Sequence, residues 1–344
     1  MSALHVQGSR LRAYLEFVTA IVFFFLARSV AQHGANGLVG EAWEPLVEQA
    51  MLAFLLIVVY AGFGGLFDRQ QHAISDQGLP LRPGFRRELG LGLAIGWGVA
   101  VACVLMLTLF GGIAVVLSLG LTSWGWLLAD AAFFACATLA EEVAFRGYGF
   151  QCFVRVVGPV GATLAFSFFY ALMQALLPGS DPTSIVVSFL FCIVLSVAYL
   201  RTRALWVSWG LNFGWKASRA LIFGLTVSGV SSHSSVVEGN PMGPFWVTGG
   251  GFGQDGTWIA FLAFLIALVV LYRATSELNY LHNAPEFIPG GIPVDLDDAA
   301  RRQHEAVMGP GTQAEKPLVQ ISPGGSVTPP AASGEPPAGP PPVD

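Results

Sequence analysis

Long uncharged runs dominate the pattern of apolar and polar positions along the chain. Residues 89–129 contain no Asp, Glu, Lys, Arg or His, whereas about 20 apolar residues are enough for a helix to cross a bilayer. Apolar segments that end at charged residues or at Gly and Pro clusters are 12–31, 49–67, 89–110, 121–141, 157–177, 184–200, 204–225 and 257–273. The pattern predicts an all-α, polytopic helical membrane bundle of about eight transmembrane helices.

The positive charges predict the orientation of these helices, because loops on the cytoplasmic side carry an excess of Lys and Arg. If eight segments alternate in direction, one side receives Arg10, Arg12, Arg69, Arg82, Arg86, Arg87, Arg146, Arg155, Arg201, Arg203 and Arg273. The opposite loops hold mainly acidic residues, and Arg28 is the one basic residue at a helix end there. We therefore expect both termini to be cytoplasmic.

Composition and charge limit the kinds of molecule that we expect the protein to bind. The 344 residues are 54% hydrophobic and 11% charged, with a net charge of −5. The lipid bilayer is thus the first expected partner, and the charge offers no basic surface for nucleic acid. The four cysteines, Cys103, Cys136, Cys152 and Cys192, lack CxxC spacing and lie in or beside apolar runs, so we expect small buried apolar side chains rather than disulfides or reactive thiolates.

Ionisable residues inside the predicted helices are candidates for function, because charges are costly in hydrocarbon. Glu142 and Arg146 stand four residues apart, which lets them pair on one helix face. Glu141 points about 100° away and is free to face another helix. One fixed and one available carboxylate suit hydrolytic chemistry, although the same residues could also cap a helix end at the membrane surface.

Three motifs carry a resemblance to a known family. Residues 141–148, EEVAFRGY, resemble the EExxxR signature of the CAAX prenyl endopeptidase and bacteriocin-processing family of intramembrane metalloproteases. Residues 168–174, FFYALMQ, and residues 205–216, LWVSWGLNFGWK, resemble the family's second and third motifs in the same order. The resemblance covers about 120–270. It implies a helical bundle whose cavity opens to the cytoplasm, where a glutamate activates water against a peptide bond.

The resemblance also implies the site and the setting. Its motif positions are Glu141, Glu142, Arg146, Gln174 and Asn212, and the family's cofactor is zinc. The implied substrate is an unknown peptide or membrane protein. Two outer-loop stretches, 223–229 and 248–256, look like those of bacterial members, so we expect a multi-pass protein of a bacterial plasma membrane.

The sequence departs from the family at three motif positions. Gln174 and Asn212 replace the two motif histidines, and Lys216 replaces the motif asparagine. All six histidines, His5, His33, His72, His233, His282 and His304, lie in predicted termini or loops. Two carboxylates with two amides would hold zinc poorly, so we expect no cofactor. Lys216 instead predicts an ammonium that replaces a cation beside Glu141.

Several interpretations stay open from the sequence. Lys216 either pairs with Glu141 or snorkels to the interface, and Gln174 either serves the site or packs between helices. Asp130 either lines the same cavity or makes an interhelical hydrogen bond. The chain is an endopeptidase that uses Glu141 as its base, a catalytically inactive relative that acts as a peptide-binding or membrane-protein scaffold, or, less in keeping with the sequence, a transporter.

The same reading divides the chain into three parts. We expect N-terminal transmembrane helices and a cytoplasmic loop in 1–90, a CAAX-protease-like membrane domain in 91–275, and a cytoplasmic Pro-rich tail in 276–344. Residues 310–344 contain ten of the 21 prolines and no aromatic residue, a composition typical of disorder. This tail is either a plain solubilising extension or a segment that recruits a partner.

Overall fold

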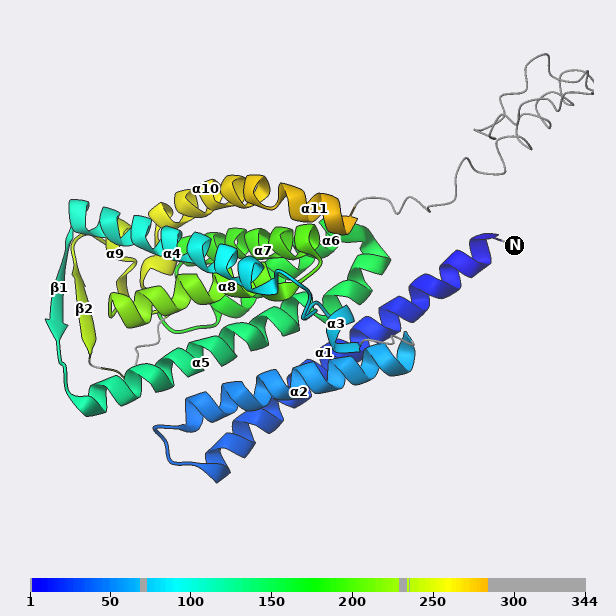
Figure 1. Ribbon diagram of the computed structural model, residues 1–344, viewed down its shortest axis with the longest axis horizontal. Helices are drawn as coiled ribbons and strands as arrows, with labels where there is room; N and C mark the ends of the chain where they lie inside the picture. Colours follow the sequence, from blue (N-terminus) through cyan, green and yellow to red (C-terminus); the bar gives the residue numbers. More distant parts are fainter. Residues whose placement is uncertain (1, 69–72, 229–233, 235, 284–344) are drawn as a thin grey trace, which may run out of the picture. The chain divides into compact units, whose positions relative to one another are not determined.

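The computed structural model of the chain describes residues 2–68, 73–228, 234 and 236–283. This part is mostly helical (Figure 1). Its helices and strands are α1 (Ser2–Leu38), α2 (Glu44–Phe67), α3 (Ala73–Asp76), α4 (Phe85–Phe110), β1 (Gly112–Leu117), α5 (Leu121–Arg146), α6 (Tyr148–Ala175), α7 (Pro182–Thr202), α8 (Leu205–Ala217), the π-helical turn η1 (Ser218–Ile222), β2 (Val237–Met242), α9 (Phe245–Thr248), the 3₁₀ turns η2 (Gly250–Phe252) and η3 (Gln254–Gly256), α10 (Trp258–Ala274) and α11 (Ser276–Asn283).

The chain is a multi-pass membrane protein. In the described part, five helical segments are long and apolar enough to cross a bilayer, and they are Arg10–Leu38, Glu44–Phe67, Phe85–Phe110, Leu121–Ala175 and Pro182–Thr202. Trp258–Ala274 is a shorter apolar helix. Helices dominate because hydrocarbon offers no hydrogen-bond partner to the backbone, so each segment must satisfy its own N–H and C=O groups. The prediction of a mostly helical membrane protein is confirmed.

One small sheet departs from the all-α prediction. Strand β1 pairs antiparallel with β2, from Gly112 opposite Met242 to Leu117 opposite Val237. The sequence of β1, GIAVVL, contains two adjacent β-branched residues after a glycine, which favours an extended conformation once a partner strand is present. The pairing joins the segment after α4 to the segment after η1, so it holds the ends of α4 and α8 at one end of the bundle (Figure 1).

Helices α4 and α8 pack with their backbones in contact. A Cβ atom at Gly92 would lie 2.1 Å from the carbonyl oxygen of Val207, and one at Gly96 would lie 2.2 Å from that of Leu211. On α8, Cβ atoms at Gly210 and Gly214 would lie 2.3 Å and 2.7 Å from backbone oxygens of α4. Two glycines spaced four residues apart on each helix form the close crossing that small residues allow in membranes. This contact fixes the helix that carries Asn212 and Lys216.

Helix α6 bends where the sequence predicted a helix to begin. Gly158 has φ 82° and ψ 168°, and Pro159 follows it. A left-handed glycine followed by a residue without an N–H interrupts the helical hydrogen bonds. The half of α6 before Gly158 carries Arg155, and the apolar half after it corresponds to the predicted segment 157–177.

The C-terminal part of the chain begins with a helix. Residues 276–283 form α11, directly after α10. The Pro-rich tail predicted for the rest of 276–344 lies outside the described residues.

The contact between α4 and α8 leads to a matched pair of substitutions. Gly96→Ala would place a methyl group against the Leu211 carbonyl, so we expect it to lower the free energy of unfolding by about 1–3 kcal/mol, the usual cost of overpacking. Gly98 lies on the same helix with nothing within 4 Å of its Cβ position. Gly98→Ala should be neutral, or stabilising by up to about 1 kcal/mol through helix propensity. Thermal unfolding in detergent measures both, and equal effects would contradict the close contact.

Candidate functional site

The candidate site lies where α5 and α8 meet in the bundle. Helix α5 carries Glu141, Glu142 and Arg146, and α8 carries Asn212 and Lys216. The indole Nε1 of Trp209, on α8, donates hydrogen bonds to the Ala135 carbonyl at 3.2 Å and to Thr138 Oγ1 at 3.1 Å on α5.

The closest polar contact of the site is the ion pair between Glu141 and Lys216. Lys216 Nζ lies 2.6 Å from both Glu141 Oε1 and Glu141 Oε2. The Lys216 side chain is 9% exposed and that of Glu141 is 30% exposed. One ammonium therefore binds both oxygens of the carboxylate, and the lysine does not snorkel away from it.

Asn212 connects the two neighbouring glutamates. Its Nδ2 donates to Glu141 Oε2 at 3.0 Å and to Glu142 Oε1 at 2.9 Å. The side chain is fully buried. Asn212 Oδ1 and Glu142 Oε2 are buried without a hydrogen-bond partner in the described part of the chain. The amide thus presents its N–H groups to the carboxylates and keeps its oxygen turned away from them.

Glu142 and Arg146 form the second ion pair, with Nη1 of Arg146 3.2 Å from Oε1 of Glu142. Both side chains are fully buried. Arg146 Nη2 also donates to the carbonyl oxygen of Cys192 at 3.2 Å and lies 3.0 Å from its sulfur, so the arginine joins α5 to α7. Two carboxylates and two cations make the site formally neutral.

A third cation, Arg219, pairs with Asp255 and not with Glu141. The sequence places Asn212, Lys216 and Arg219 on one face of an α-helix, but α8 ends at Ala217 and a π-helical turn follows. The wider turn changes the direction of Arg219. Its Nη2 lies 3.0 Å from Asp255 Oδ1, and its guanidinium stacks 3.7 Å above the ring of Trp215.

The described hydrogen bonds of Gln174 and Asp130 go to other partners than the residues of the site. Gln174 Nε2 donates to Tyr170 Oη at 3.1 Å, one turn earlier on α6, and within the described residues it makes no hydrogen bond to Glu141 or Asn212. Asp130 Oδ2 accepts from the backbone N–H of Ser234 at 2.8 Å. Asp130 lies 11 residues before Glu141 on α5, which is roughly 16 Å along the helix axis.

The residues of the site do not fit a zinc ion. Zinc is bound by lone pairs of carboxylate, imidazole or thiolate groups. Both oxygens of Glu141 receive the Lys216 ammonium, and Asn212 directs an N–H₂ group, which donates and does not coordinate, toward both carboxylates. In the part of the chain that the structure describes, no group of three His, Cys, Asp or Glu side chains is placed to share a metal ion.

Sequence reasoning missed two residues that organise this region. Trp209 fixes α8 against α5. Asp255 accepts from Trp215 Nε1 at 3.0 Å and from the Ser228 backbone N–H at 3.1 Å, in addition to its pair with Arg219. The sequence does show Asp255 as a charged residue in a glycine-rich segment of a largely apolar chain. It does not show the partner of Asp255, because Arg219 is 36 residues away.

Comparison with known proteins identifies the segment that holds this site. Residues 122–218 match the family model described as type II CAAX prenyl endopeptidase Rce1-like. The matched segment runs from the start of α5 to the end of α8 and includes every motif position named above. Comparison with the curated proteins and with the solved structures gives no significant match.

The ion pair predicts coupling between its two positions. Lys216→Met leaves a largely buried carboxylate unpaired, and we expect it to reduce the free energy of unfolding by about 2 kcal/mol, below the 3–5 kcal/mol of a fully buried pair because Glu141 is partly exposed. The double variant with Glu141→Gln should recover part of this loss, since the unpaired charge is gone. Unfolding in detergent measures the four proteins of the cycle.

A second cycle serves as the control. Glu238→Gln changes an exposed glutamate on β2, and its effect should add to that of Lys216→Met within about 0.5 kcal/mol. If the Glu141 cycle were equally additive, the ion pair would not contribute to stability and its proposed importance would be wrong.

Proposed function

Because residues 122–218 match the Rce1-like family of type II CAAX prenyl endopeptidases, we propose that the chain keeps the family's membrane domain and does not hydrolyse peptide bonds. In this proposal it acts as a membrane-embedded scaffold that binds a peptide or another membrane protein. The observation that carries the proposal is the position of Lys216 Nζ, 2.6 Å from both oxygens of Glu141.

The ion pair opposes both ways in which Glu141 could assist hydrolysis. A metal ion would have to enter beside a fixed ammonium, which repels it, and no imidazole is placed to hold it among the described residues. A general base must accept a proton from water at hydrogen-bond distance. Here Glu141 already accepts from Lys216 at both oxygens and from Asn212 at one of them, so the pair must open before water can bind.

Buried charge then has a structural role. Glu141, Glu142, Arg146 and Lys216 neutralise one another inside the bundle, with Asn212 between the two carboxylates. Such paired charges specify which helix faces meet, because any other packing leaves a charge unpaired in hydrocarbon. A scaffold needs a single stable arrangement of helices, and this network favours one.

The arrangement of helix ends supports eight membrane crossings with both termini on the arginine-rich side. At one end β1 pairs with β2, which joins the segments after α4 and η1. At the other end Leu205 N donates to Gly78 O at 2.6 Å, and Arg201 Nη2 donates to Tyr272 O at 2.9 Å. These contacts match the alternation of eight segments. We assign the arginine-rich side to the cytoplasm of a bacterial cell.

The three-part division of the chain belongs to the same proposal. We propose that residues 1–90 add N-terminal helices beside the family segment, that residues 91–275 are the membrane domain, and that residues 276–344, of which the structure describes only 276–283, are a cytoplasmic tail. Helix α1 packs on α2 through a hydrogen bond from Tyr60 Oη to the Ala20 carbonyl oxygen at 3.1 Å, which supports an accessory role for the N-terminal helices.

Activity and metal content test the absence of hydrolysis directly. Purified protein in lipid vesicles should leave a fluorogenic farnesylated CAAX peptide uncleaved, and it should hold far less than one zinc per chain by elemental analysis. Lys216→Asn should not create activity, because both motif histidines are still absent. Cleavage or stoichiometric zinc in the unmodified protein, lost in Glu141→Gln, would show that the site is a working endopeptidase.

Single cysteines test the proposed topology. Cysteines at Ile74 and Glu277 should react with a membrane-impermeant maleimide only after the cells are opened, because both positions lie on the proposed cytoplasmic side. Cysteines at Gly40, Pro178 and Asn240 should react on intact cells. The unmodified protein, whose four free cysteines are largely buried, is the background control. Two or more positions labelled from the wrong side would rule out the eight-crossing arrangement.

A further inference from the structure

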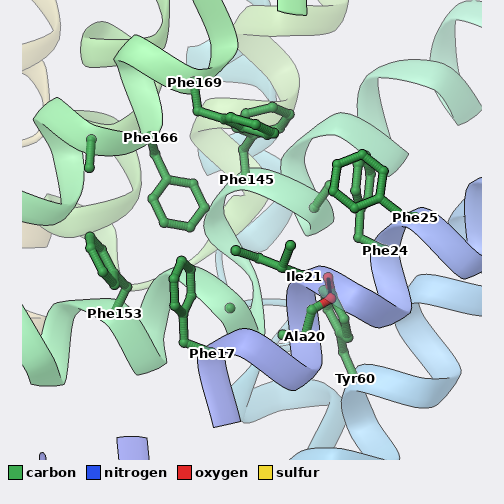
Figure 2. Close-up of a pocket in the computed structure, with 13 residues that line it drawn as sticks. Phe17, Ala20, Ile21, Phe24, Phe25, Tyr60, Phe145, Phe153, Phe166 and Phe169 are labelled. Atoms are coloured by element: carbon green, nitrogen blue, oxygen red, sulfur yellow. Dashed lines mark hydrogen bonds between the residues drawn. The ribbon is translucent and has the colours of Figure 1, made fainter. Parts of the chain in front are cut away.

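An apolar cavity of about 200 Å³ lies between α1, α2, α5 and α6 (Figure 2), and its wall includes none of the paired residues Glu141, Glu142, Arg146 and Lys216. Its wall consists mainly of aromatic side chains, among them Phe17, Phe24, Phe145, Phe153, Phe166 and Phe169. The one hydroxyl in the wall, Tyr60 Oη, already donates to the Ala20 carbonyl oxygen. A cavity of this size without free polar groups stays dry and accepts hydrocarbon.

The cavity has an edge toward the lipid. Ile21 is 37% exposed, Phe25 is 48% exposed and Phe169 is 36% exposed, and all three line it. Their helices are among those long and apolar enough to cross the membrane, so this exposed surface meets acyl chains. A hydrocarbon chain can therefore enter from the side.

A basic side chain, Arg10, lies on α1 before the residues that line the cavity. Arg10 stands seven residues before Phe17 and fourteen before Phe24, and this spacing places all three on one face of the helix, with Arg10 roughly 10 Å from Phe17 along the axis. Arg10 is exposed and forms no ion pair with any other described residue. This distance suits the span from a lipid phosphate to the body of its acyl chain.

The surroundings of Arg10 are positively charged overall. Arg10 shares a groove with Arg12 and Arg155, next to the carboxylates of Glu16 and Asp68. Arg12 pairs with Glu16 at 2.8 Å, and Arg155 bridges Glu16 at 3.0 Å and Asp68 at 2.8 Å. Three cations against two anions leave one positive charge, which Arg10 carries toward solvent. Basic pockets at helix ends attract anionic lipid headgroups.

We propose that an anionic phospholipid binds along α1, with its phosphate at Arg10 and one acyl chain in the aromatic cavity. The headgroup pairs with the cation that lacks an internal partner, and the chain fills the space between α1 and α6. This proposal does not depend on whether the Glu141 site is active, because none of Glu141, Glu142, Arg146 and Lys216 lines the cavity. The lipid is a structural ligand that joins the N-terminal helices to the membrane domain.

Lipid retention in native mass spectrometry tests both halves of the proposal. The full chain, delipidated in detergent, is titrated with palmitoyl-oleoyl phosphatidylglycerol and separately with the phosphatidylcholine of the same chains. We expect tighter binding of the phosphatidylglycerol. Arg10→Ala should weaken it roughly fivefold, the order expected for one arginine near a membrane surface, and should weaken the phosphatidylcholine less, because its choline ammonium already offsets the charge of the phosphate. Arg86→Ala, which changes an exposed arginine on α4, should have no effect.

A second set of variants tests the acyl-chain site by filling the cavity. Ala165→Phe places a ring at the exposed edge of the cavity and should weaken both lipids, whereas Ala132→Phe, at an exposed position of α5 outside the cavity, should not. Inorganic phosphate at the same concentration should not displace the lipid. Equal binding of the two lipids, an unchanged affinity in Ala165→Phe, or displacement by phosphate would each overturn the proposal.

Discussion

Four charges constrain the rest of this structure, because three of them are buried and the fourth, on Glu141, is only partly exposed, so each must meet an opposite charge within the bundle. Glu141 pairs with Lys216 and Glu142 pairs with Arg146, and Asn212 donates to both carboxylates. The Glu142 pair lies within α5, whereas the Glu141 pair and the Asn212 bonds form only when α8 stands at the right rotation and depth against α5. The same contacts that stabilise the bundle occupy the carboxylate on which hydrolysis would depend.

The glycines of α8 explain why its polar residues face α5. Gly210 and Gly214 press against the backbone of α4. Asn212 and Lys216 are offset from them by two residues, about 200° around the helix, and therefore point to the opposite side. Small residues on one face and polar residues on the other thus determine the orientation of α8. The close contact with α4 therefore affects the site only by setting the direction in which Asn212 and Lys216 point.

The two basic residues near the end of α8 bind different carboxylates. Lys216 turns to Glu141, whereas Arg219, after the π-helical turn, turns to Asp255 and stacks on Trp215. Asp255 also accepts from Ser228, so the glycine-rich segment closes over the end of the helix. The separate acceptors leave Glu141 with a single ammonium.

The sequence by itself determined the helical segments and the local pair of Glu142 and Arg146, since lipid requires helices and a spacing of four residues sets that pair. It also indicated that Lys216 stands where a cation would be needed. Only the tertiary structure decided that Lys216 and not Arg219 reaches Glu141, that Gln174 bonds within its own helix, and that β1 pairs with β2. These outcomes depend on a π-helical turn and on contacts between distant residues, and neither leaves a periodic signal in the sequence.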